Sequence, residues 1–122
     1  MNKKLINAVA KQMGGRANLK DHASDICNYG AAGGFNGFVY YTDTAAFTKR
    51  NHAVINELLN NYADDMGTTA LELLSGFYCF KDMKEHEIFD GLMNPKSDDR
   101  TTIYNGLAWF ALEEVARYIE EN

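Results

Sequence analysis

Residues 103–116 read IYNGLAWFALEEVA and lie in a strongly apolar part of the chain. In a helix that follows Asp98 or Asp99, either of which is a suitable N-cap residue, apolar side chains would occupy nearly every face. A surface helix carries one apolar stripe, whereas a helix that is apolar around most of its girth is usually buried. The sequence therefore predicts a central C-terminal helix on which the rest of the chain packs.

Shorter helices are predicted elsewhere from apolar residues spaced three and four positions apart. The clearest covers residues 55–66 and ends at Gly67, and Thr68 or Thr69 then caps another helix. The remaining helices are expected over residues 3–13, 18–29, 42–50 and 84–93. Outward from the central helix, the pattern predicts a mainly α fold: a compact bundle of about six helices around the C-terminal helix.

Two short apolar runs are ambiguous. The run FVYY at residues 38–41 is rich in aromatic and β-branched side chains, so a short extended segment is expected there. The run at residues 77–80 is consistent with either a helix end or a buried strand. Residues 30–37 are rich in glycine but match neither a Walker loop nor a dinucleotide-binding fingerprint.

Length and composition set further bounds. The 122 residues suit one domain, residues 1–122, and 46% hydrophobic with 24% charged residues is ordinary for a globular protein. No apolar run reaches the roughly 18 residues of a membrane span, so no membrane contact is expected. Two cysteines are too few for a disulfide scaffold, and we expect a cytoplasmic protein with both thiols structural.

Charge is distributed unevenly. Residues 1–50 carry seven cations against three acids, whereas residues 51–122 carry five cations against 14 acids. An acidic field of this kind attracts basic surfaces, although surface acids also serve solubility. The candidate partner-binding residues are therefore acids of the second half of the chain: Asp64, Asp65, Glu72, Glu113, Glu114, Glu120 and Glu121.

Groups for catalysis or metal binding do not come together in the sequence. The three histidines are widely separated, and a zinc site needs three or four ligands. No nucleophile, base and oxyanion donor can be assembled, so we predict no enzyme, no cofactor and no metal. Residues 57–77 imitate a helix-turn-helix, but residues 51–80 contain no Lys or Arg to hold phosphates. Direct binding to duplex DNA is therefore not expected.

Two segments carry a family resemblance. Residues 33–44 (GGFNGFVYYTDT) and 105–116 (NGLAWFALEEVA) resemble motifs of small acidic proteins of phages, prophages and other mobile elements, a family known as a domain of unknown function. The resemblance covers about residues 20–120. It implies a protein that inhibits a bacterial defence complex, with anti-CRISPR proteins among the candidates. The implied partner is a host protein or ribonucleoprotein with a basic surface, such as a CRISPR effector.

Two other functions stay open. The basic N-terminal patch of Lys3, Lys4, Lys11 and Arg16 would suit a nucleic-acid-linked accessory protein. The glycine-rich residues 30–37 would suit a module that binds a small ligand. The sequence also leaves the formation of a homo-oligomer open.

Overall fold

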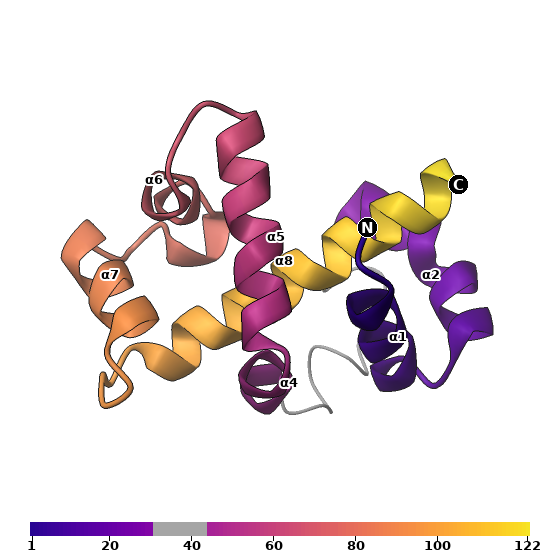
Figure 1. Ribbon diagram of the computed structural model, residues 1–122, viewed down its shortest axis with the longest axis horizontal. Helices are drawn as coiled ribbons and strands as arrows, with labels where there is room; N and C mark the ends of the chain where they lie inside the picture. Colours follow the sequence, from indigo (N-terminus) through magenta and orange to yellow (C-terminus); the bar gives the residue numbers. More distant parts are fainter. Residues whose placement is uncertain (31–43) are drawn as a thin grey trace.

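The C-terminal helix α8 (Arg100–Glu121) organises the molecule. The structure, a computed structural model, describes residues 1–30 and 44–122, and within these residues α8 is the longest helix. It runs across the whole molecule in Figure 1, and ten of its 22 residues are buried. The prediction of a central C-terminal helix is confirmed.

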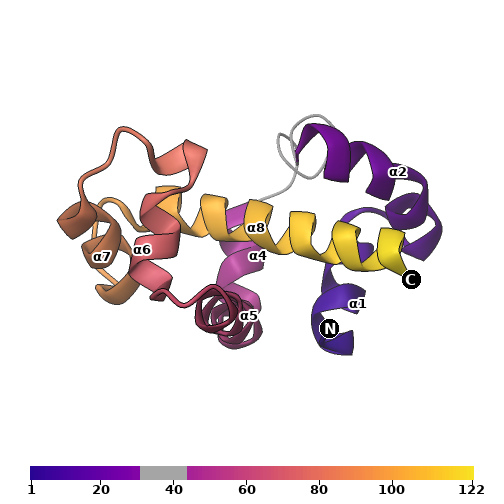
Figure 2. The ribbon, with the colours of Figure 1, turned by 90° about the horizontal axis from the view of Figure 1, so that it is seen from above.

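Six α-helices of the described residues surround α8 (Figures 1 and 2). α5 crosses it near the middle, α6 and α7 lie at its N-terminal end, and α1 and α2 flank its C-terminal half. Their bounds are α1 Lys3–Gln12, α2 Arg16–Tyr29, α4 Thr44–Arg50, α5 His52–Asp65, α6 Ala70–Ser75 and α7 Glu85–Met93. The mainly α bundle around the last helix is thus confirmed. Within the described residues 1–30 and 44–122, no helix is both long enough and apolar enough to cross a lipid bilayer.

The predicted helix ends are close to the observed ones, with two early starts. α2 begins at Arg16 rather than residue 18, and α5 begins at His52 rather than residue 55. In both cases the first three residues of the helix include no buried apolar side chain, so the periodic pattern begins only at Leu19 and Ile55 and cannot mark where the helix begins. α1 ends where Gly14 and Gly15 adopt φ of 85° and 126°, which side-chain-bearing residues rarely tolerate.

The segment after α6 resolves one ambiguity. Thr69 is the residue that caps α6, and its hydroxyl accepts a hydrogen bond from the Glu72 N–H at 3.2 Å. Residues 78–80 form a 3₁₀-helix, η2 (Tyr78–Phe80), so the strand alternative is wrong. Phe80 is buried against α8, while Tyr78 is 80% exposed. The extended segment expected at residues 38–41 lies outside the described residues.

A polar cluster fixes the corner between α4 and α5 on α8. The buried Thr48 hydroxyl donates to the Tyr104 carbonyl oxygen at 2.6 Å, and Thr44 hydrogen-bonds to Asn105. The His52 ring lies 5.4 Å from the Tyr104 ring. Burial, together with the charge of Arg100, lowers the pKa of His52, so the imidazole is neutral near pH 7. These contacts fix the end of α4 and the start of α5 on the N-terminal half of α8.

Candidate functional site

The predicted acids fall into two groups. Five of them are exposed at or near helix ends: Asp64 and Asp65 end α5, Glu72 lies in α6, and Glu120 and Glu121 end α8. The other two lie on α8 and are half-buried: Glu114 faces α5, and Glu113 lies beside Gly30 at the end of α2. Glu113 and Glu114 are therefore less accessible to a partner than the other five acids.

Four of the five exposed acids lie where they do not favour stability, whereas Glu72 lies in the first turn of α6, where a carboxylate is favourable. A helix C-terminus carries a partial negative charge, so acids there destabilise the helix and basic residues stabilise it. α5 ends on Asp64 and Asp65, α8 ends on Glu120 and Glu121, and neither helix has a basic residue in its last turn. The negative potential of these helix ends is thus increased rather than neutralised.

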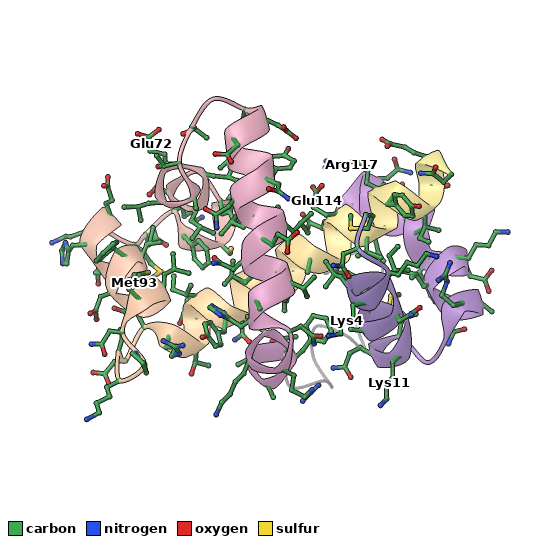
Figure 3. All side chains as sticks on the ribbon, in the orientation of Figure 1. Lys4, Lys11, Glu72, Met93, Glu114 and Arg117 are labelled. Carbon is green, nitrogen blue, oxygen red and sulfur yellow. The ribbon has the colours of Figure 1, made fainter. Side chains whose placement is uncertain are left out.

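Glu114 and Arg117 form an ion pair on α8, with Nη1 of Arg117 2.9 Å from Oε1 of Glu114 (Figure 3). The Glu114 side chain is only 12% exposed and that of Arg117 is 50% exposed. Burial raises the pKa of Glu114, Arg117 opposes that rise, and the charges of Glu113 and Glu121 add to it. The charge of Glu114 raises the pKa of Arg117. Burial lowers it, and a hydrogen bond with the Tyr62 hydroxyl raises it again, so the pKa is raised overall.

An acidic cleft lies on one side of this ion pair. It has a volume of about 390 Å³ and separates the start of α1 from α5 and the last turns of α8. Three carboxylates line it, those of Glu57, Glu114 and Glu121, together with the Arg117 guanidinium. Glu57 is the residue that the selection of acids by sequence missed, although it lies in the same stretch without cations.

An aromatic cleft of about 470 Å³ lies on the other side of the ion pair. α8 forms one wall, and the ends of α2 and α6, together with η2, form the others. Glu113, Glu114 and Arg117 line it on α8, so the two clefts adjoin at Glu114 and Arg117. Among the described residues, six aromatic side chains line it: Tyr29, Tyr62, Phe77, Tyr78, Trp109 and Phe110.

The rings of the aromatic cleft pack on one another. The Phe110 ring lies 5.9 Å from the Tyr62 ring in an edge-on arrangement and 5.7 Å from the Phe77 ring. Tyr29 and Tyr78 are 73% and 80% exposed, which is unusual for side chains of this size. The sequence did not predict this cleft, because α2, α5, α6, η2 and α8 all contribute to it. The spacing of Trp109, Phe110 and Glu113 on one helical face was its only local signal.

Both cysteines are exposed, so Cys79 is not the small buried side chain that its aromatic neighbours in the sequence indicate. Cys27 lies near the end of α8, and partial desolvation followed by the charge of Glu120 raises its pKa. Cys79 lines the aromatic cleft, where partial desolvation also raises its pKa. A raised pKa keeps a thiol protonated at neutral pH, so neither sulfur is activated as a nucleophile.

The raised pKa of Glu114 predicts a pH dependence of stability. The folded protein retains the proton above the ordinary value of 4.5, so between the two values it binds more protons than the unfolded chain. The free energy of unfolding should therefore fall as pH rises from about 4.5 through the folded-state pKa. Glu114→Gln should lack this fall, measured by urea unfolding across a pH series.

The variant Arg117→Gln should have the opposite effect on the pH dependence of stability. It removes the charge that lowers the pKa of Glu114, so the fall in the free energy of unfolding should become larger and extend to higher pH. A Glu114→Gln protein that keeps the wild-type pH profile would show that another group causes it.

Comparisons with known proteins give a family and no function. A family model described as a domain of unknown function (DUF7222) matches residues 2–122. No curated protein and no solved structure matches the chain significantly. Since the match spans nearly all of the sequence, the chain belongs to the DUF7222 family.

Proposed function

We propose that this protein is a phage- or mobile-element-encoded inhibitor that binds a host defence complex through its acidic face. The acidic face comprises the exposed acids at the ends of α5 and α8, Glu72, and the two clefts at Glu114 and Arg117. The target presents a basic, nucleic-acid-binding surface, and a CRISPR effector is the target that the family resemblance favours. The protein acts by contact or by occupying the channel of the nucleic acid, not by catalysis.

The placement of the acids is the observation that carries this proposal. Carboxylates at helix C-termini cost stability, so a role in binding explains their position better than a role in folding. Asp64–Asp65 and Glu120–Glu121 both occupy such ends. Cations of a partner would interact favourably with these helix ends, and this interaction would offset the stability that the carboxylates cost the free protein.

Some of the acids lie far from the end of the basic patch at Lys11. In Figure 3, Glu72, Glu114 and Arg117 lie in the upper part of the molecule and Lys11 lies at the lower edge. Lys3, Lys4 and Lys11 are exposed on α1, and Arg16 is exposed at the start of α2. A basic partner would therefore be attracted toward the acidic face and repelled from the basic patch.

Charge reversal tests the acidic face. The variant Asp64→Lys, Asp65→Lys, Glu72→Lys should bind its captured target about tenfold more weakly, because exposed ion pairs each contribute roughly 0.2–1 kcal/mol and reversal adds repulsion. The target is first identified by affinity capture from host lysate, and affinity is then measured by titration at two salt concentrations. The wild-type affinity should fall as salt rises.

A matched control distinguishes the effect of where the reversed acids lie from the effect of the change in net charge. Asp21→Lys, Asp25→Lys, Glu85→Lys reverses three exposed acids of α2 and α7 and changes the net charge by the same amount. Its affinity should stay near the wild-type value. If the first variant is folded by circular dichroism and still binds and inhibits its target with unchanged affinity, the acidic face is not the interface.

The exposed cations on α1 and at the start of α2 keep the second candidate function testable. A nucleic-acid-linked accessory protein would bind RNA or DNA through Lys3, Lys4, Lys11 and Arg16, with an affinity that falls steeply with salt. This function would be favoured if the double variant Lys4→Glu, Lys11→Glu no longer bound nucleic acid while the triple acid reversal still did. The small-ligand module at residues 30–37 lies, except for Gly30, outside the described residues.

A further inference from the structure

We infer that the contact between His52 and Tyr104 is an acid-sensitive switch in the fold. When the His52 imidazole gains a proton, the first turn of α5 comes away from α8. Val54 lies in that turn and lines the acidic cleft, so the wall of the cleft changes with it. The inference goes beyond the proposed function, because it concerns a conformational change of the free protein and needs no target.

The Tyr104 ring contacts two side chains that both carry a positive charge at low pH. The His52 ring centre lies 5.4 Å from the Tyr104 ring centre. The Arg100 guanidinium lies 4.5 Å from the same ring centre, and it also donates a hydrogen bond to the Tyr104 hydroxyl. Tyr104 is only 5% exposed. A protonated His52 would therefore add a second cation to a buried ring that already holds one, where water screens their repulsion poorly.

One nitrogen of His52 makes the charged form still less favourable. Nε2 is buried and has no hydrogen-bond partner among the described residues. A neutral imidazole carries one N–H, whereas an imidazolium carries an N–H on both nitrogens. Protonation would thus leave a buried N–H without an acceptor, a cost that disappears once the ring reaches water. The proton therefore favours the state in which the first turn of α5 has opened.

The charges around His52 do not offset an imidazolium. The first turn of α5 contains no acid, and the start of a helix is its positive end. The charged groups of the adjoining elements are Arg100 on α8, the exposed Lys49 and Arg50 at the end of α4, and Asp98 and Asp99 before α8. Of these, Arg100 is the one whose charge lowers the pKa of His52, after the larger effect of burial.

The direction of the pH effect follows from this lowered pKa. The closed state takes up the proton less readily than an imidazole with the ordinary value of 6.5, so opening becomes more favourable as pH falls below 6.5. Each pH unit by which the pKa of His52 lies below that value favours opening tenfold once both states are protonated. Glu114 has the opposite effect on global unfolding, so the switch has to be measured locally.

Hydrogen exchange of one backbone amide provides the local measurement. The Ile55 N–H closes the first turn of α5 and lies 3.0 Å from the Asn51 carbonyl oxygen. Its protection, corrected for the intrinsic effect of pH on exchange, should fall several-fold between about pH 7.5 and 5. The Leu73 N–H, which closes the first turn of α6 at 2.9 Å from the Thr69 carbonyl oxygen, should keep its protection. In an NMR titration, the His52 ring should titrate below 6.5.

Three variants assign the effect to its groups. His52→Gln cannot gain a charge, so Ile55 should keep its protection down to pH 5 in this variant. His86→Gln removes an exposed histidine of α7 and is the matched control, which should show the wild-type fall. Arg100→Gln removes the repelling charge, so the midpoint of the His52 titration should rise. This last measurement keeps the inference testable if His52→Gln does not fold.

Three results would overturn the inference: a His52 midpoint at or above 6.5, an equal fall of Ile55 protection in His52→Gln, or an unchanged His52 midpoint in Arg100→Gln. The proposed function is tested by other residues and another measurement. Loss of the switch leaves the charge-reversal result at Asp64, Asp65 and Glu72 unaffected, and failure of the charge reversal leaves the titration of His52 unaffected.

Discussion

Leu107→Ala should lower the free energy of unfolding by about 2–5 kcal/mol, the range for a large apolar side chain removed from a packed core. Leu107 is 1% exposed and lies in the middle of α8, among buried residues of the same helix such as Ile103, Ala108 and Ala111. Truncation removes its buried surface and leaves a cavity that the rigid central helix cannot easily close. Chemical unfolding followed by circular dichroism measures the loss.

The control for this prediction lies on the same helix. Thr102→Ala changes an exposed residue in the first turn of α8 and should alter the free energy of unfolding by less than about 0.5 kcal/mol. A loss of that small size for Leu107→Ala would instead mean that α8 is peripheral and that the bundle is organised around another helix.

The central helix could be predicted because its signal is local and strong. Residues 103–116 are apolar on nearly every face, and only burial from several sides satisfies such a helix. Helix starts were less predictable, as at His52 and Arg16, because three opening residues without a buried side chain leave no periodic pattern. Residues 77–80 could not be assigned because four apolar residues fit a short helix and a strand equally well.

The candidate site was predictable only in part. The exposed acids at the ends of α5 and α8 follow from charge and helix boundaries, both visible in the sequence. The half-burial of Glu113 and Glu114 depends instead on how the other helices pack on α8, which is fixed by long-range contacts such as that of Thr48 with Tyr104. The aromatic cleft depends on the same packing, so nothing in the sequence indicated that residues such as Tyr29 and Tyr78 line one cleft.

Gly106→Ala should destabilise the protein by about 3 kcal/mol, at the upper end of the usual range for overpacking a core. Sequence reasoning predicts the opposite sign, since alanine is favoured over glycine in a helix interior by about 1 kcal/mol. The structure reverses this expectation. A Cβ on Gly106 would lie 2.8 Å from Cε1 of Phe80 and closer still to Cζ, well inside contact distance.

The Phe80 ring cannot easily withdraw, because it is 1% exposed and packs beside Phe77, whose ring centre is 6.0 Å away. A double-mutant cycle isolates this contact. Phe80→Leu shortens the side chain that faces Gly106, so Gly106→Ala should cost much less in the Phe80→Leu background than in the wild type. Equal costs in the two backgrounds would show that the clash lies elsewhere. Because Gly106 also lines the aromatic cleft, the cycle tests the same close approach of η2 to α8 that forms the wall of that cleft.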